Sequence, residues 1–439
     1  MRFYNRETEL ILLNKIFSQA DRSGKMTVIT GRRRVGKTML SLESVKNQKH
    51  VYFFVSKKSE RLLVEDFINE IKKSLDFPII GSFRTISQVF ELLLEIGKNE
   101  KFTVIFDEFQ DFTNINPTVY GEIQKLWDLN RLDVRMHVIF SGSVYSVMTR
   151  LFEHAKEPLF GRADRIIVLQ PFNIKTIWAI LNDYGVNDLR VLTDFYTITG
   201  GIPKYIDMLV TNNVFTFNDA IDFICQEYSP FLNEGKNLLI EELGKEYATY
   251  FSILSLISSG KNSRPEMESI LEKPIGGHLD RMISTYGILK SKRPVSSKPQ
   301  SRTMKYEIAD NFLRFWFRFI YKNNQAIETG NFNYVKEIIS RDYAAYSGPL
   351  FEKFFHDLFA MSGKYNKIGS YWEKGNSNEI DLVAVNDMEK RITIAEIKRN
   401  RENISIRALK EKSQKLLQSY KKYEAEYLAL NYENIRDYL

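Results

Sequence analysis

Residues 31–38 have the composition and spacing of a phosphate-binding loop. They fit the pattern GxxxxGK followed by Ser or Thr, and they read Gly31-Arg32-Arg33-Arg34-Val35-Gly36-Lys37-Thr38. The glycines let backbone N–H groups curl around the β- and γ-phosphates of a nucleotide, Lys37 would reach the same phosphates, and the Thr38 hydroxyl can ligate Mg²⁺. We therefore expect a nucleotide site made of these residues and of Met39, which follows them.

The segments on either side of this loop are the elements that must position it. Residues 26–30 are apolar and β-branched, which is typical of a buried strand, and residues 39–43 are typical of a helix. In a strand, loop and helix arranged in this order, backbone N–H groups at the helix N-terminus can bind phosphate. The sequence therefore predicts a nucleotide-binding α/β domain rather than a structural glycine turn.

A pair of carboxylates follows a second apolar run, residues 102–106. Asp107 and Glu108 stand at the carboxyl end of this predicted strand, which is where parallel α/β sheets bind ligands. We expect Asp107 to hold Mg²⁺ through water and Glu108 to polarise the water that attacks the γ-phosphate.

Two kinds of side chain could add to this site. The predicted strand at residues 137–140 ends at Ser141 and Ser143, and either hydroxyl could contact the γ-phosphate or the attacking water; the alternative is an ordinary turn. Arg162, before another predicted strand, could neutralise charge on the γ-phosphate, in cis or from a second subunit. Arg165 is a slightly less favoured candidate, and a surface salt bridge is the alternative for both arginines.

The N-terminal segment offers a place for the base of the nucleotide. Residues 3–20 are expected to begin with a turn and to continue as an amphipathic helix. Tyr4, Asn5 and Arg6 lie in the turn, where they could pack over an adenine. The alternative is a plain helix start.

The composition describes a globular chain with a positive charge. The 439 residues are 44% hydrophobic and 27% charged, which indicates about two to four domains. With no apolar run of membrane length and no signal-peptide core, we expect a cytoplasmic protein without a membrane partner. The single cysteine excludes an internal disulfide and no Cys/His spacing fits zinc, so any metal should be oxygen-bound, as Mg²⁺ or Mn²⁺. The net charge of +7 is compatible with a nucleic-acid partner or with a merely basic protein.

The pattern of the chain changes after residue 236. Helical stretches followed by two short strands occur at residues 247–257, 264–272, 277–286, 287–290 and 305–308. This is the order of a winged helix-turn-helix domain, whose basic wing at residues 291–302 suits a phosphate backbone; the alternative is a protein-packing module. For the aromatic-rich residues 310–321 we expect a buried linker helix rather than a surface that stacks on bases.

The C-terminal part contains a second candidate site on two neighbouring strands. Glu396 and Lys398 share one face of a predicted strand at residues 392–398, and Asp381 can approach them from the strand before it. Asp381 and Glu396 could hold a divalent metal, with Glu352 from a preceding helix as a further acid. Lys398 could orient the attacking water. The alternative is an ion-paired hairpin without catalysis.

Several of these segments together resemble the archaeal and bacterial ATPase family of the AAA+ superfamily, close to the STAND-type NTPases. The resemblance covers roughly the first half of the chain and is carried by Asn5-Arg6-Glu7, the loop at residues 31–38, Phe106-Asp107-Glu108-Phe109-Gln110, Leu159-Phe160-Gly161-Arg162 and Thr199-Gly200-Gly201-Ile202-Pro203-Lys204-Tyr205. It implies ATP as the ligand and a five-stranded parallel core. It also implies a helical lid at residues 172–235, in which Pro203 belongs to a turn that approaches the nucleotide.

The C-terminal constellation resembles the PD-(D/E)XK nuclease superfamily, in the form found at the end of such ATPases. Asp381, Glu396 and Lys398 match its motif, and Glu352 matches the helix-borne acid that some members add. The resemblance implies an α/β nuclease-like fold. It leaves cleavage open, because this fold also serves as a binding or structural module.

We therefore expect an α/β protein with five parts. They are an ATPase core at residues 1–171, a helical lid at 172–235, a winged helix at 236–309, a linker helix at 310–340 and a nuclease-like domain at 341–439. The expected function is Mg²⁺-dependent hydrolysis of ATP coupled to DNA binding, with metal-dependent DNA cleavage left open. The principal alternative is a STAND-like switch, controlled by nucleotide, whose tail binds nucleic acid or protein without chemistry. An arginine that acts in trans would require an assembly of identical chains.

Overall fold

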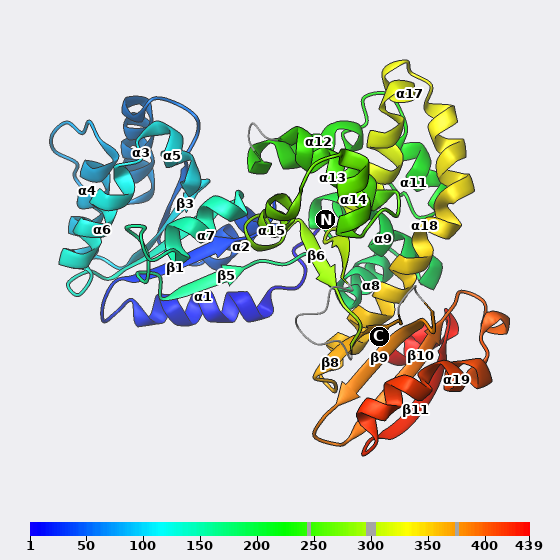
Figure 1. The fold of residues 1–439 in the computed structure, drawn as a ribbon. Helices are drawn as coiled ribbons and strands as arrows, with labels where there is room; N and C mark the ends of the chain where they lie inside the picture. Colours follow the sequence, from blue (N-terminus) through cyan, green and yellow to red (C-terminus); the bar gives the residue numbers. More distant parts are fainter. Residues whose placement is uncertain (244–246, 296–303, 374–376) are drawn as a thin grey trace. The chain divides into compact units, whose positions relative to one another are not determined.

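A computed structural model of the protein describes residues 1–243, 247–295, 304–373 and 377–439. The chain forms two compact units, one at Arg2–Pro171 and one at Phe172–Leu439, to which Met1 also belongs (Figure 1). Among the helices described, none is both long and apolar enough to cross a membrane.

The first unit is built on a parallel sheet of five strands in the order β2-β3-β4-β1-β5. The strands are β1 (Lys25–Thr30), β2 (His50–Phe54), β3 (Phe102–Asp107), β4 (Met136–Gly142) and β5 (Arg165–Val168). The loop at residues 31–38 follows the carboxyl end of β1, between two neighbouring strands, and Asp107 ends β3. The parallel α/β core predicted from the sequence is therefore confirmed.

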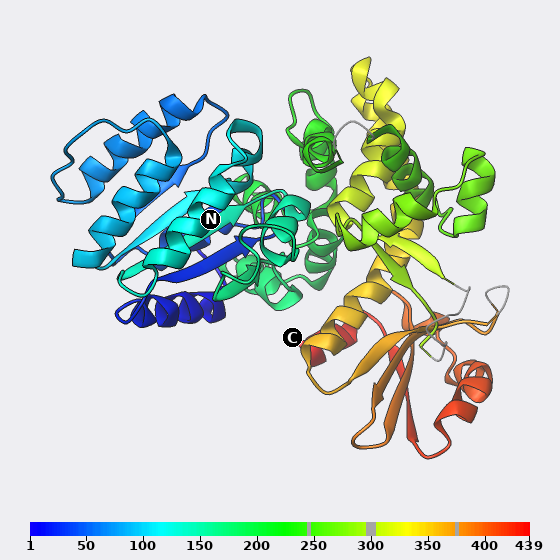
Figure 2. The same cartoon turned by 60° about the vertical axis from the view of Figure 1, so that its left-hand side comes forward.

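Helices cover both faces of this sheet, as Figure 2 shows. In β3, Val104 and Phe106 belong to the core on one face and Ile105 to the core on the other, because neighbouring side chains of a strand point in opposite directions. The helices on the Ile105 face are α1 (Glu7–Gln19) and α2 (Lys37–Ser44). Those on the opposite face are α3 (Glu60–Ser74), α4 (Ile86–Asn99), α6 (Val119–Asn130) and α7 (Tyr145–Glu153), with the short α5 (Phe112–Ile115). Burial on both faces explains why the strands are apolar throughout.

The second unit begins with helices and then forms a small hairpin. The helices are α8 (Ile174–Asp183), α9 (Leu189–Thr199), α10 (Pro203–Thr211), α11 (Phe217–Ile224), α12 (Phe231–Leu243), α13 (Tyr247–Ser258), α14 (Arg264–Leu271) and α15 (Gly276–Ser284). The strands β6 (Leu289–Lys292) and β7 (Lys305–Ile308) pair antiparallel. The last three helices and β7 lie within two residues of the predicted elements, and β6 begins two residues later than the strand predicted at residues 287–290. Part of the predicted wing, residues 296–303, lies outside the described residues.

The aromatic-rich segment forms a broken helical run instead of one linker helix. The run consists of α16 (Asn311–Phe315), a π-helical turn (Trp316–Ile320), a 3₁₀ turn (Tyr321–Asn323) and α17 (Asn324–Glu328). Phe312, Phe315, Trp316, Phe317 and Phe319 are buried. These rings therefore belong to a core and are not available to stack on bases. The next helix, α18 (Phe332–Met361), runs through residue 341, so the boundary expected there falls inside a helix.

The C-terminal part is a four-stranded sheet with a helix against it. Its order is β11-β10-β9-β8, and the strands are β8 (Lys367–Tyr371), β9 (Ile380–Asn386), β10 (Arg391–Ile397) and β11 (Glu424–Leu430). β8 and β9 pair antiparallel with a bulge between Gly369 and Tyr371, β9 and β10 pair antiparallel, and β10 and β11 pair parallel. The helix α19 (Ile406–Leu417) contributes Leu409 and Leu416 to the core of this sheet.

Candidate functional sites

The phosphate-binding loop has a backbone that requires its two glycines. Gly31 has φ 144° and Gly36 has φ 93°, which are values that favour glycine. A Cβ at Gly31 would lie 2.5 Å from the carbonyl oxygen of Leu169, at the end of the neighbouring strand β5. The close approach of these two backbones fixes the exit of the chain from β1.

The first two residues of α2 connect the loop to the end of β3. Lys37 is buried, and its Nζ donates to the carbonyl oxygens of Gly31 at 2.9 Å and Arg32 at 3.0 Å. Thr38 Oγ1 donates to Oδ2 of Asp107 at 2.6 Å. The predicted phosphate ligand and the two predicted Mg²⁺ ligands therefore lie at one end of the sheet.

A third side chain, Tyr52 of β2, completes the surroundings of Asp107. Its hydroxyl donates to the same Oδ2 at 2.9 Å, while the backbone N–H of Glu108 donates to Oδ1 at 3.1 Å. Tyr52 lies opposite Ile105 in the sheet register, and Ile105 shares a strand face with Asp107. Burial, followed by the charge of Asp107, raises the pKa of Tyr52, so the hydroxyl remains a donor.

Glu108 is held by neighbours of its own. Its Oε2 accepts from Ser143 Oγ at 2.6 Å and from Gln110 Nε2 at 2.6 Å, and the backbone of Glu108 has φ 56°. Arg33 of the loop reaches the same Ser143 hydroxyl, with Nε at 3.5 Å. Of the two candidate serines, the structure brings Ser143 to the acid; the buried Ser141 hydroxyl has no hydrogen-bond partner among the described residues.

The N-terminal residues lie against the loop through a buried arginine. Arg6 Nη2 donates to the carbonyl oxygens of Val35 at 3.3 Å and of Gln170 at 2.6 Å. Asn5 caps the backbone N–H of Arg6 with its side-chain oxygen, and Arg2 stacks on the ring of Tyr4. Arg6 thus fastens the start of α1 to the loop, and the adenine contact of Tyr4, Asn5 and Arg6 remains a prediction.

The remaining predicted nucleotide ligands have other neighbours. Arg162 forms an ion pair with Asp128 of α6 at 2.9 Å. A surface salt bridge was the alternative to a contact of Arg162 with the γ-phosphate. Met39 is more than half exposed. Pro203 is the first residue of α10, in the second unit, and its approach to a nucleotide remains a prediction.

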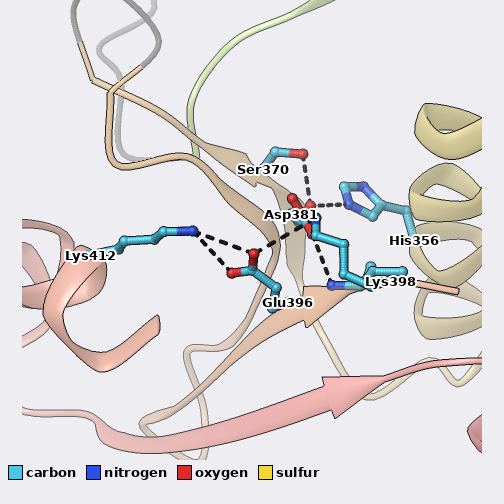
Figure 3. A network of polar contacts seen from close by, with 7 residues as sticks. His356, Ser370, Asp381, Glu396, Lys398 and Lys412 are labelled. Carbon is cyan, nitrogen blue, oxygen red and sulfur yellow. Dashed lines mark hydrogen bonds and ion pairs between the residues drawn. The ribbon is translucent and has the colours of Figure 1, made fainter. Parts of the chain in front are cut away.

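The second site lies where β9 and β10 meet α18 and α19 (Figure 3). Lys398 Nζ lies 2.8 Å from Asp381 Oδ2 and 3.7 Å from Glu396 Oε1, so the lysine bridges the two acids. The backbone N–H of Ile397 donates to the same Asp381 oxygen at 2.8 Å, and Lys412 of α19 pairs with Glu396 at 3.2 Å. The three motif residues predicted from the strand pattern therefore lie together.

Two further side chains hold the backbone of Asp381. His356 Nε2 lies 2.7 Å from its carbonyl oxygen, and Ser370 Oγ donates to that oxygen at 2.9 Å. Burial lowers the pKa of His356, which favours a neutral ring with the proton on Nε2. Because Ser370 is the residue in the β8 bulge, the irregularity of the strand aims its hydroxyl at this carbonyl.

Glu352 of α18 belongs to the electrostatic surroundings of this site. Burial and then the charge of Asp381 raise the pKa of Glu352 to about 7, against the opposing effects of Lys292 and Lys398. Across the described ranges, no three His, Cys, Asp or Glu side chains are close enough to form a ready metal site. The pair Asp381 and Glu396 is instead bridged by Lys398.

The sequence analysis assigned no role in either site to Tyr52, Gln110, His356, Ser370 and Lys412. Tyr52 carries a usable signal, since it is the one polar side chain in the apolar run at residues 51–55. His356 also carries one, because it lies one helical turn after Glu352 on the same helix face. The other three reach their sites through turns or pairings that the local pattern does not indicate.

Comparison with known proteins supports the prediction of an ATPase domain in the first half of the chain. Residues 3–209 match the model of an ATPase domain found predominantly in Archaea. Residues 316–415 match a model described as archaeal and bacterial proteins of unknown function. An uncharacterised protein of Methanocaldococcus jannaschii is 28% identical over 407 residues, which are 90% of this chain and 87% of the relative.

Solved structures show the same kind of fold. A Walker-type ATPase of Pyrococcus abyssi superposes with a TM-score of 0.55 at 17% identity, over 72% of this chain and 96% of that protein. The ORC2 protein of Aeropyrum pernix, solved as ADPNP–ADP complexes, gives 0.50 at 15% identity, over 75% and 95%. Residues 3–209 are therefore similar to an archaeal-type P-loop ATPase domain, and the chain continues into a C-terminal domain of the kind found in archaeal and bacterial proteins of unknown function.

Proposed function

We propose that the protein binds ATP with Mg²⁺ at the loop of residues 31–38 and hydrolyses it. The observation that carries this proposal is the 2.6 Å contact of Thr38 with Asp107 at the end of the sheet. A hydroxyl and a carboxylate are oxygen ligands of the kind that Mg²⁺ prefers, so the residues present fit the ion. Bound there, Mg²⁺ would neutralise charge on the phosphates.

The side chains of the loop region would act in turn on the nucleotide. Lys37 would exchange its two carbonyl partners, Gly31 and Arg32, for phosphate oxygens, because an ammonium pairs more strongly with an anion than with a carbonyl. Glu108 would exchange Ser143 and Gln110 for the attacking water, whose oxygen adds to the γ-phosphorus as the bond to the β-phosphate oxygen breaks.

Two substitutions test this assignment. Lys37→Ala should abolish hydrolysis because phosphate binding is lost, and Glu108→Gln should lower kcat by about 10²- to 10⁴-fold while ATP binding is retained. Phosphate release and binding of a fluorescent ATP analogue are the measurements. Lys46→Ala and Glu91→Gln change exposed residues of the same unit and serve as controls. Hydrolysis by Glu108→Gln at the wild-type rate would assign the water to another residue.

We further propose that the C-terminal site acts on nucleic acid. The observation that supports this is the position of Lys398 between Asp381 and Glu396, with Glu352 close by. The carboxylates of Asp381 and Glu396 would supply oxygen ligands to a divalent ion, and that ion would polarise a phosphodiester. Lys398 would then orient a water whose oxygen adds to phosphorus as the bond to one ester oxygen breaks, and the proton that the water loses would end on that ester oxygen.

The alternative is a switch, controlled by nucleotide, whose C-terminal domain binds without chemistry. It is favoured by the ion pairs of Lys398 with Asp381 and of Lys412 with Glu396, which neutralise both acids. In that case ATP would set the conformation, and the lysines would bind the anionic partner.

Incubation with DNA distinguishes a nuclease from a switch that binds without chemistry. Linear, circular and single-stranded DNA would be incubated with the protein and Mg²⁺ or Mn²⁺, with and without ATP, beside Asp381→Ala and Lys398→Ala. Lys415→Ala, an exposed lysine of α19 that pairs with Glu373, is the matched control. Cleavage lost only in the first two variants and on removal of the metal by chelation supports a nuclease. DNA binding without cleavage under all of these conditions supports the switch.

A further inference from the structure

The hairpin β6–β7 is attached to the edge of the C-terminal sheet. The backbone N–H of Val295 donates to the carbonyl oxygen of Ser370 at 3.0 Å, and Lys305 Nζ lies 4.8 Å from the ring centre of Trp372. Val295 also packs against the hydrophobic core of the C-terminal sheet. The hairpin therefore contacts this sheet through backbone, cationic and apolar groups together.

The sequence of β8 is adapted to this contact. A Cβ added at Gly369 would lie 2.8 Å from Cγ2 of Val295, so the absence of a side chain there lets the hairpin approach. The neighbouring bulge shifts the register at Ser370. Ser370 thus accepts from Val295 with its carbonyl oxygen while its hydroxyl donates to Asp381. One residue joins the hairpin to the backbone of the candidate catalytic acid.

The hairpin also brings charge to the site. Lys292 is the last residue of β6 and lies opposite Lys305 of β7, whose Nζ lies over the ring of Trp372 next to the end of β8. Lys292 is only partly buried, and its Nζ lies 3.8 Å from Oε1 of Glu307, with which it forms an ion pair. Such a pair on a partly exposed strand is weak, so an anionic ligand can compete for the lysine.

From this arrangement we propose that Lys292 is a substrate-binding residue of the C-terminal site, where it binds a backbone phosphate of the nucleic acid that lies over Asp381 and Glu396. The inference rests on the proposed action of this site on nucleic acid. It differs from the action of an independent wing, because Lys292, Lys398 and Lys412 would contact one continuous stretch of substrate. The hairpin β6–β7 and the C-terminal sheet would then form a single binding surface.

Binding of a short fluorescein-labelled DNA, duplex and single-stranded, by the full chain tests the proposal. Fluorescence anisotropy in Ca²⁺ avoids cleavage, and titrations at several salt concentrations give the salt dependence. Lys292→Ala should weaken binding and reduce the slope of log Kd against log salt by about one. Lys292→Arg should restore most of the affinity and most of the salt slope, because a positive charge alone is required.

Lys364→Ala is the matched control for the loss of one positive charge. Lys364 is exposed and its backbone lies beside Asn386, at the opposite end of β9 from Asp381. We expect its affinity and salt slope to equal those of the wild type. An equal loss in Lys364→Ala and Lys292→Ala would mean that only the net charge matters, and would overturn the proposal.

Crosslinking decides whether the hairpin and the acids share one substrate. With a photoreactive side chain in place of Lys292 or Lys412, adducts should map to the same or adjacent nucleotides of one DNA. Adducts at separate places would show that the hairpin binds as an independent wing. If Lys398→Ala loses DNA binding and Lys292→Ala binds like the wild type, the C-terminal site still binds nucleic acid. The assignment of Lys292 as a substrate-binding residue would then be wrong. A wild type that binds no DNA would overturn both.

Discussion

At the scale of single residues, the two candidate sites hold their aspartates in a similar way. Oδ2 of Asp107 accepts from Thr38 and Tyr52 at 2.6 and 2.9 Å, and Oδ2 of Asp381 accepts from Ile397 N–H and Lys398 at 2.8 Å each. Two donors on one oxygen leave the carboxylate little freedom to rotate. A fixed carboxylate can receive a cation or a water without reorganisation, which is the physical basis of both proposed activities.

Tyr52 gives a prediction at this scale. Tyr52→Phe removes one hydrogen bond to Asp107, which is worth about 1 kcal/mol, so kcat/KM for Mg·ATP should fall about fivefold. The Mg²⁺ concentration for half-maximal hydrolysis should rise, while nucleotide binding measured in EDTA should be unchanged.

Tyr120→Phe is the control for the loss of a buried tyrosine hydroxyl. That hydroxyl bonds to Thr113 and to the carbonyl oxygens of Phe109 and Gln110, in the same unit. We expect lower stability in this variant and an unchanged Mg²⁺ requirement. An unchanged Mg²⁺ requirement in Tyr52→Phe as well would reduce Tyr52 to a packing residue.

At the scale of elements, α18 contacts the helices α9 and α16 with some side chains and the C-terminal site with others. On one face, Lys353 Nζ donates to Asn311 of α16 at 2.7 Å and Asp357 accepts from Tyr196 of α9 at 2.5 Å. On the neighbouring face, Glu352 and His356 belong to the C-terminal site. Both pairs are spaced by four residues, so each pair lies on one stripe of the helix. A rotation or shift of α18 would change both sets of contacts together.

The contact between α9 and α18 can be tested through Tyr196. Tyr196→Phe leaves the carboxylate of Asp357 without this donor, which should lower the free energy of unfolding by about 1–3 kcal/mol. Urea unfolding followed by circular dichroism is the measurement. Tyr334→Phe, at a half-exposed side chain of α18, should change stability by less than about 0.5 kcal/mol. Equal stability of the two variants would mean that the Tyr196 bond contributes nothing.

At the scale of the whole molecule, the ATPase similarity extends beyond the first compact unit. The matched residues 3–209 include α8, α9 and most of α10, although the first unit ends at Pro171. α9 contacts α18 through Tyr196 and through Asp194, which accepts from Tyr343 at 2.7 Å. Part of the ATPase-like region is therefore packed against the helix that carries Glu352 and His356. This packing lies inside the second unit.

The local parts of both sites could be predicted from the residue pattern alone. The loop of residues 31–38 lies on contiguous residues between a strand and a helix, and Asp107 and Glu108 directly follow their strand. The meeting of Asp381 with Glu396 and Lys398 also followed from the two-residue period of adjacent strands. These features depend on neighbours in the chain or on one regular pairing, so the residue pattern is sufficient to predict them.

The distant groups that complete the sites became visible only in the folded chain. β8 and β11 were not predicted. Ser370 of β8 donates to Asp381 with its hydroxyl and accepts from Val295 with its carbonyl oxygen, which attaches the hairpin to the edge of the sheet. Tyr52 reaches Asp107 because β2 and β3 pair in one register, and the approach of Val295 depends on a bulge beside Gly369. Such contacts join residues far apart in sequence, and their geometry depends on register and packing, which no local pattern of side chains specifies.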